Sequence, residues 1–300
     1  STVAMEMSPY KFDGKGGKGA PEHTHIFPLP DAFRGKYKGK NIGKRYAEEV
    51  KLQINEVQKT GRNIAAFIIE PIISCGGQIE LPKNFLKEAY NHIRKAGGLC
   101  ISDEVQTGCG RMGKTWWGFQ LHDVVPDIVT MGKPLGNGHP LAAVACNQEV
   151  ANAFANGMEY FNTFGGNPVS CAIGIEVLQT VKCEKLRENA LLVGNFLKDE
   201  LLKLSKEFSI IGNVRGQGFF LGIELVDKNR SPLAEQTDYL ANRMKDFGIL
   251  MSTDGPDHNV LKIKPPMVFT KDNAKELIFY LKKIFAEDFM LSYEPKNHKK

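Results

Sequence analysis

Hydrophobic residues in the first half of the chain recur at two alternating spacings. Tyr46, Val50, Ile54 and Val57 follow one another at helical steps, which predicts a helix that ends near Gly61. The preceding residues, 11–42, are rich in glycine, lysine and proline and predict irregular, exposed structure.

Short apolar runs come after such helices. Residues 65–69 (AAFII) are uninterrupted by polar side chains, which is typical of a strand buried on both faces. A second helical stripe, at 85–93, precedes another strand-like run at 99–102, and two more runs follow at 128–130 and 141–145. The alternation of helix and strand predicts an α/β fold whose large domain holds a mostly parallel sheet.

Three residues with reactive side chains follow strand-like runs directly. Glu70 comes after the first run, Asp103 after the second, and Lys133 shortly after the third. Chemistry in parallel sheets gathers at the carboxyl ends of the strands. One crevice is therefore expected to hold all three.

The pattern changes near residue 168. Two long helices are predicted over 168–182 and 184–206, followed by short strands at 218–225 and 259–263 and by helices near 233–246 and 271–286. We therefore predict a large domain over residues 1–167, and a linking helix with a smaller α+β domain over residues 168–300.

Composition describes an ordinary globular protein: 42% of the 300 residues are hydrophobic and 24% are charged. The net charge of +5 comes largely from a basic C-terminal tail, so neither a nucleic-acid nor a membrane partner is expected. Six cysteines without a C-x-x-C pair predict free thiols in a reducing compartment, either the cytoplasm or the mitochondrial matrix. The chain starts at Ser1 in loop-like sequence, and we expect its large domain to be incomplete at the N-terminus.

Asp103 and Lys133 have the side chains that a pyridoxal cofactor requires. A lysine amine holds pyridoxal phosphate as a Schiff base, and a carboxylate keeps its pyridine nitrogen protonated so that the ring accepts electrons. Either residue alone would be better explained as a helix cap or a surface lysine. Together, flanked by glycine and proline, they predict a pyridoxal-phosphate site.

Two further motifs suggest other kinds of site, and each lacks a feature that its site needs. Residues 108–113 (GCGRMG) match a dinucleotide-binding pattern, but the sequence after them has no helical stripe, which such a site needs. His23 and His25 have no second pair of ligands, so we expect no metal site.

The chain resembles the class III aminotransferases, a fold-type I group of pyridoxal-phosphate-dependent enzymes. The resemblance runs from about residue 22 to 289 and is carried by residues 66–71 (AFIIEP), 103–108 (DEVQTG), 130–138 (TMGKPLGNG) and 162–168 (NTFGGNP). It implies that Asp103 pairs with the pyridine nitrogen, that Lys133 forms the Schiff base, and that Gln106 lies near the ring hydroxyl. Glu70 is expected at the cofactor as well.

The same resemblance implies a homodimer with shared active sites. Thr163 would donate its hydroxyl to the cofactor phosphate in the partner subunit. The family's phosphate-binding turn and the aromatic residue that stacks on the ring have no match in this sequence and would lie before Ser1.

The resemblance also suggests which reaction to expect. Family members that use glutamate have a second Glu where this chain has Cys75, and an Arg where it has Lys262. Lysine lacks the planar fork with which arginine binds a carboxylate through two hydrogen bonds. The two changes together speak against ordinary glutamate transamination.

Further segments are similar to ethanolamine-phosphate phospho-lyase and 5-phosphohydroxylysine phospho-lyase. They are residues 8–12 (SPYKF), 30–35 (PDAFRG), 74–79 (SCGGQI) and 254–256 (DGP). This branch implies elimination of phosphate and ammonia from a phosphorylated primary amine, leaving an aldehyde. Arg34, Lys262 and Lys264 are candidates for binding the substrate phosphate, although solvated surface positions explain them nearly as well.

Two alternatives stay open. One is a transaminase that moves an amino group between an amine or amino acid and an oxo acid. The other is an inactive fragment that serves as a binding or structural subunit.

Overall fold

The computed structural model describes residues 2–292 and contains two compact units. Unit 1 comprises Ser1–Phe67 and Leu81–Leu99, and unit 2 comprises Ile68–Glu80 and Cys100–Lys300. The basic tail lies outside the described residues. The domain boundary expected at residue 168 stays a prediction.

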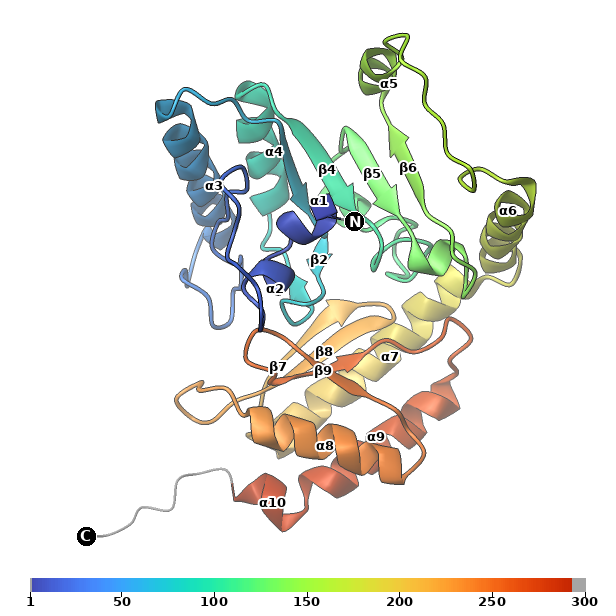
Figure 1. Cartoon of the computed structure of the whole chain (residues 1–300). Helices are drawn as coiled ribbons and strands as arrows, with labels where there is room; N and C mark the ends of the chain where they lie inside the picture. The colour runs from blue at the N-terminus through green and yellow to red at the C-terminus, as the bar shows by residue number, and fades with distance from the viewer. Residues whose placement is uncertain (1, 293–300) are drawn as a thin grey trace. The chain divides into compact units, whose positions relative to one another are not determined.

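Unit 1 is built on two packed helices, α3 (Ile42–Lys59) and α4 (Phe85–Lys95) (Figure 1). The helical stripe predicted from residue 46 to residue 57 is buried, and so is the stripe on α4. Gly43 lets the helices approach, since a Cβ there would lie 2.1 Å from the Lys83 carbonyl oxygen. Short helices α1 (Thr2–Glu6) and α2 (Pro9–Phe12) precede the irregular segment.

The first sheet contains the four strands predicted from the apolar runs. They are β1 (Ala66–Ile69), β4 (Leu99–Asp103), β5 (Ile128–Met131) and β6 (Ala143–Cys146), in the order β1-β4-β5-β6. β4 and β5 run parallel, whereas β6 pairs with β5 antiparallel. Helix α5 (Gln148–Phe154) follows β6.

The prediction that the first strand is buried on both faces was wrong. Phe67 is buried and packs in unit 1 against Phe27 and Tyr90, but its neighbour Ala66 is exposed. Burial along β1 therefore alternates, because successive side chains point to opposite faces and the described aromatic contacts reach only the Phe67 side.

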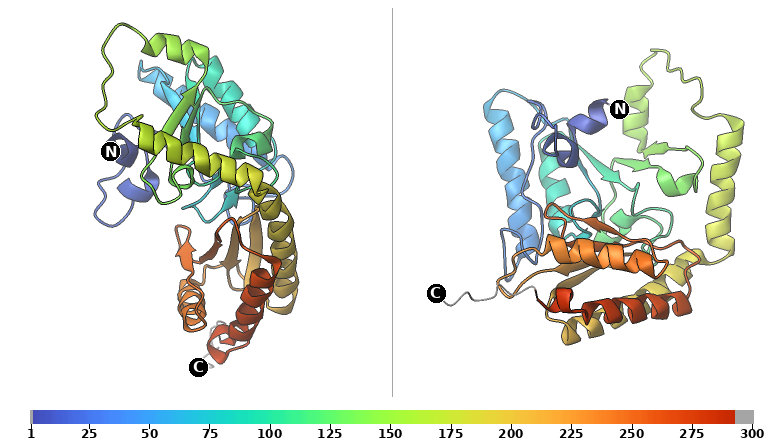
Figure 2. Two further views of the ribbon diagram at one scale, coloured as in Figure 1. Left: turned by 90° about the vertical axis from the view of Figure 1, so that its right-hand side faces the viewer. Right: turned by 60° about the horizontal axis from the view of Figure 1, so that its bottom comes forward.

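The second sheet is antiparallel and lies wholly in unit 2. Its order is β7 (Ile211–Gln217), β8 (Phe220–Leu225), β10 (Val260–Ile263) and β9 (Ser252–Asp254). Helices α7 (Leu186–Glu207) and α8 (Ala234–Asp246) pack on it (Figure 2). Helix α9 (Lys271–Phe285) packs against both helices and contributes to the same core. The predicted α+β character is confirmed, but β7 and β9 were missed, because their sequences (IGNVRGQ and STD) lack an apolar run.

The two faces of this second sheet differ in chemistry. On β8, Leu221, Ile223 and Leu225 enter the core shared with the helices. The alternate residues point the other way: Phe220 packs with Ile72, while Gly222 and Glu224 belong to a polar face. The hairpin of β2 (Ile72–Ile73) and β3 (Ile79–Glu80) lies against this polar face.

A long helix, α6 (Pro168–Cys183), precedes α7, and α10 (Asp288–Leu291) is the last described element. Short 3₁₀ turns cover Gly118–His122 and Lys133–Leu135. Among residues 2–292, no helix combines the length and the apolar composition needed to cross a bilayer.

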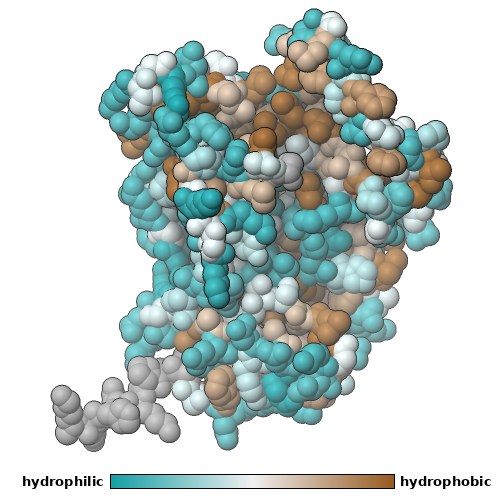
Figure 3. Space-filling model, in the orientation of Figure 1, coloured by the Kyte–Doolittle hydropathy of each residue, from teal (hydrophilic) through white to brown (hydrophobic). Residues whose placement is uncertain are grey.

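Large apolar side chains are exposed over β6, α5 and α6, and brown residues gather in this region of Figure 3. They include Val144, Phe154, Phe161, Phe164, Val169 and Ile175. An exposed apolar patch of this extent is typical of an interaction surface.

Gly194 of α7 provides a test of the packing in unit 2. A Cβ at Gly194 would lie 2.4 Å from the Gly218 carbonyl oxygen, whereas the close contact of a Cβ at Gly174 of α6 is with the flexible end of the Leu141 side chain. We expect Gly194→Ala to lower the free energy of unfolding by about 1–3 kcal/mol through overpacking. Gly174→Ala, the matched control, should be neutral or stabilising, since alanine favours helix. Chemical denaturation measures both, and equal effects would contradict the packing described.

Candidate active site

Asp103 and Lys133 lie at the ends of adjacent parallel strands. β4 ends at Asp103, which is in register with Thr130 of β5, and Lys133 follows β5 after one glycine. The Asp103 carboxylate accepts a hydrogen bond from the Val105 amide at 3.0 Å, which fixes its orientation. Lys133 has a φ of +28°, a conformation that residues other than glycine rarely adopt and that is often found at functional sites.

Glu70 faces the same sheet edge. Its carboxylate accepts hydrogen bonds from the Ser74 amide at 3.0 Å and the Ser74 hydroxyl at 2.6 Å. Burial raises the pKa of Glu70; the Ser74 hydrogen bonds oppose this rise, Asp103 adds to it and Lys133 lowers it. Asp103 and Lys133 therefore both lie within electrostatic reach of Glu70.

Lys264 and Gln106 connect this edge to the second sheet. The Lys264 amine donates to Gln106 Oε1, and both residues belong to unit 2. Burial of the amine lowers the pKa of Lys264 to about 8, with further lowering by Arg111, Lys133 and Lys262. The residue as a whole is exposed.

Arg111 was missed in the sequence because it lies inside the glycine-rich segment 108–113. Its guanidinium donates to the Pro265 carbonyl at 2.8 Å, beside Lys264, and burial lowers the pKa of Arg111 to about 10. The segment forms turns and no helix opens on it. Gly113 is needed for close packing, since a Cβ there would lie 2.5 Å from the Leu191 amide nitrogen.

Lys262 is paired with Asp254. Its amine lies 2.8 Å from Asp254 Oδ2, and the same oxygen accepts a hydrogen bond from Gln78 Nε2 at 2.8 Å. Lys262 and Asp254 both influence Cys75, whose pKa is raised mainly by burial and then by Asp254 and Glu70. The segments 74–79 and 254–256, noted separately in the sequence, are thus in contact.

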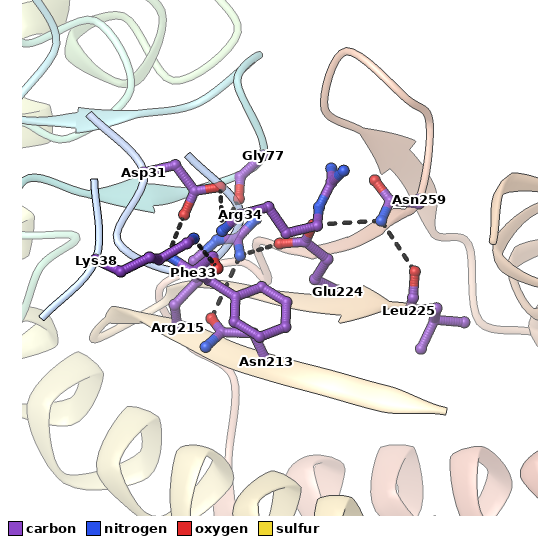
Figure 4. A network of polar contacts seen from close by, with 10 residues as sticks. All are labelled: Asp31, Phe33, Arg34, Lys38, Gly77, Asn213, Arg215, Glu224, Leu225 and Asn259. Atoms are coloured by element: carbon purple, nitrogen blue, oxygen red, sulfur yellow. Dashed lines mark hydrogen bonds and ion pairs between the residues drawn. The ribbon is translucent and has the colours of Figure 1, made fainter. Parts of the chain in front are cut away.

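Arg34 lies in unit 1, on a turn formed by residues 31–35. The Asp31 carboxylate accepts hydrogen bonds from the Phe33 amide at 2.6 Å and the Arg34 amide at 3.1 Å (Figure 4). A Cβ at Gly35 would lie 2.2 Å from the Tyr46 hydroxyl, so the turn admits no side chain there. The segment PDAFRG is thereby explained as a rigid turn that carries Arg34.

Thr163 lies in an exposed segment between α5 and α6 and makes no hydrogen bond to Asp103 or Lys133 among the described residues. Next to it, a cavity of about 360 Å³ is lined by residues of the segments 139–142 and 164–170. In its wall, His139 Nε2 lies 2.7 Å from the Ser170 hydroxyl.

The residues at the sheet edge suit pyridoxal phosphate. The Lys133 amine suits the aldehyde of the cofactor, and the fixed Asp103 carboxylate suits its protonated ring nitrogen. The Gln106 amide suits the ring hydroxyl. Among the described residues, no cluster of His, Cys, Asp or Glu suits a metal ion.

Comparisons with known proteins agree with this chemistry. The family model of the class III aminotransferases matches residues 3–285. The chain belongs to this family. The family is pyridoxal-phosphate-dependent, which confirms the predicted cofactor class. Similarity to solved structures of the family confirms the α/β fold.

Relatives within the family carry two kinds of name. An "alanine–glyoxylate aminotransferase 2-like" protein of Drosophila melanogaster is 46% identical over 283 residues, covering 91% of this chain and 57% of the relative. "Ethanolamine-phosphate phospho-lyase homolog 1" of Caenorhabditis elegans is 42% identical over 301 residues, covering 95% and 64%. Similar aminotransferases of Arabidopsis thaliana and Homo sapiens are named as mitochondrial.

Among solved structures, a phospholyase from Arthrobacter in complex with phosphoethanolamine superposes with a TM-score of 0.84 at 36% identity. The match covers 89% of this chain and 64% of that one. The chain therefore spans less than two thirds of the length of these relatives.

The surroundings of Lys264 predict unusual reactivity. Its amine, with a pKa of about 8, loses its proton as the pH rises through 8 and then reacts with acylating reagents. Lys203, whose pKa is raised above 10.5 by its hydrogen bond to Glu200, serves as the unreactive control. Mass spectrometry of acetylated peptides at pH 7 to 10 measures both sites. Equal pH profiles for the two lysines would contradict the environment described for Lys264.

Proposed function

We propose that this chain carries the active site of a pyridoxal-phosphate-dependent lyase. The enzyme eliminates phosphate from a phosphorylated primary amine, and water then hydrolyses the enamine product to an aldehyde and ammonia. The observation that carries the proposal is the group of cations within electrostatic reach of Lys264: Arg111, Lys133 and Lys262. A phosphate dianion is the substrate group that such a cluster stabilises.

The cofactor, when bound, supplies an electron sink for the electron pair left as the C–H bond beside the substrate nitrogen breaks. Asp103 would hold the proton on the ring nitrogen, and Gln106 would contact the ring hydroxyl. The Lys133 amine would take the proton from the substrate carbon. The Glu70 carboxylate would lie on the cofactor side of the site.

On the substrate side of the site, Lys262 and Lys264 would bind the leaving phosphate. Neither presents the planar fork that reads a carboxylate, so their chemistry favours a phosphate over the side-chain carboxylate of glutamate. Arg34, which lies on the turn held by Asp31, stays a further candidate for binding a phosphate. The phosphoethanolamine in the Arthrobacter structure and the name of the nematode relative support this substrate class.

We also propose that the protein acts as a homodimer, with Thr163 reaching the cofactor phosphate of the partner subunit. Thr163 and its neighbours are exposed, and the apolar patch over β6, α5 and α6 offers a surface that a second subunit would cover.

Product analysis tests the proposed reaction. We expect the cofactor-loaded protein to release phosphate and ammonia in equal amounts from phosphoethanolamine or 5-phosphohydroxylysine, without an amino acceptor. Lys133→Ala should abolish the release, because no amine remains to move the proton. Transfer of the amino group from alanine to glyoxylate without phosphate release would identify a transaminase instead. If neither reaction occurs, the binding or structural role remains as the explanation.

A further inference from the structure

The loop that joins β2 to β3 is anchored on the polar face of the second sheet. Arg215 Nε donates to the Gly77 carbonyl at 2.7 Å, and the Gly255 amide donates to the Cys75 carbonyl at 3.2 Å. Arg215 is only 7% exposed and forms an ion pair with Glu224, which is 1% exposed (Figure 4). The loop therefore has a fixed position within unit 2.

Gln78 ends this loop and is fully buried. Its φ of +53° is a conformation that favours glycine. The presence of glutamine there is therefore better explained by its side-chain hydrogen bonds than by the backbone conformation. Nε2 uses both of its hydrogens, donating to the Ser74 carbonyl at 3.0 Å and to Asp254 Oδ2 at 2.8 Å.

The Gln78 amide has one allowed orientation. Its Oε1 faces Gly222, where a Cβ would lie 2.9 Å away, so the absence of a side chain at Gly222 makes room for it. In the reversed orientation Oε1 would point at the Asp254 carboxylate, and two acceptors would face each other.

Asp254 transmits this orientation to Lys262. Oδ2 of Asp254 accepts from Gln78 and also pairs with the Lys262 amine, both at 2.8 Å. Lys262 stands opposite Gly222 in the β8–β10 register, so Gln78, Asp254 and Lys262 share the polar face. Lysine has a flexible four-carbon stem, and a fixed carboxylate limits where its amine lies.

We propose that Gln78 is a positioning residue that, through Asp254, fixes the Lys262 amine for the phosphate of the substrate. The role rests on the proposed function and names the part of the chain that sets its specificity. Asp254 uses one of the three N–H donors of Lys262 and leaves the others for the ligand. Because Asp254 already balances the charge of Lys262, a monoanionic carboxylate gains less at this pair than a phosphate dianion.

The test compares Gln78→Glu with a matched control, Gln217→Glu, in the cofactor-loaded protein. Gln217 Nε2 donates to Glu80 Oε1 at 2.8 Å, so the same substitution sets a carboxylate against a carboxylate away from Lys262. We expect Gln78→Glu to raise the KM for phosphoethanolamine and the Kd for inorganic phosphate about tenfold or more, with kcat changed far less. Gln217→Glu should leave both constants within about twofold of the wild-type values.

A reciprocal variant separates positioning from folding. Gln78→Glu combined with Asp254→Asn keeps one carboxylate and one amide in the contact, with the hydrogen bond reversed. We expect it to recover a large part of the phosphate affinity lost in Gln78→Glu. Circular dichroism of each variant checks that the fold is retained.

The outcomes distinguish this inference from the proposed reaction. Phosphate release by the wild type together with unchanged constants in Gln78→Glu overturns the positioning role and leaves the lyase standing. Phosphate binding that depends on Gln78, without phosphate release from any phosphorylated amine, supports the positioning role and overturns the lyase. A lower kcat with unchanged KM in Gln78→Glu would also overturn the positioning role.

Discussion

Arg215 and Glu224 form an ion pair that is almost withdrawn from water on the polar face of the second sheet. Removing one partner of such a pair typically costs about 3–5 kcal/mol, because the other charge is left buried and uncompensated. Arg215 also donates to the Gly77 carbonyl, so the pair fixes the loop that carries Cys75 and Gln78. In the proposed arrangement, Gln78 of this loop positions Lys262 through Asp254, and the substrate side of the site would therefore depend on the ion pair.

The cofactor side is held by different means. Asp103 and Lys133 sit where two parallel strands end, and their separation follows from the strand register. Glu70 is tied to Ser74, the first residue of the anchored loop, so the same loop contacts both sides of the site. Gln106 and Lys264 make the second connection.

The sequence predicted the parts of the site that depend on local pattern. Apolar runs mark the strand ends that precede Glu70 and Asp103, and a family motif marks Lys133. The contact between Gln78 and Asp254 spans 176 residues, and no periodicity reports such a contact. β7 was missed because glycine and polar residues interrupt its sequence, and its pairing with β8 supplies the stability instead. Arg111 was hidden in a glycine-rich segment whose glycines are needed for packing on α7.

Lys133 and Lys264 lie within electrostatic reach of each other. Because the pKa of its amine is about 8, Lys264 is the alternative lysine for forming the Schiff base with the cofactor. Borohydride reduction of the cofactor-loaded protein fixes pyridoxal phosphate on the lysine that holds it, and peptide mapping identifies that lysine. We predict that the reduced pyridoxal phosphate is found on Lys133 in the wild type and in Lys264→Met. A label on Lys264, retained in Lys133→Ala, would contradict it.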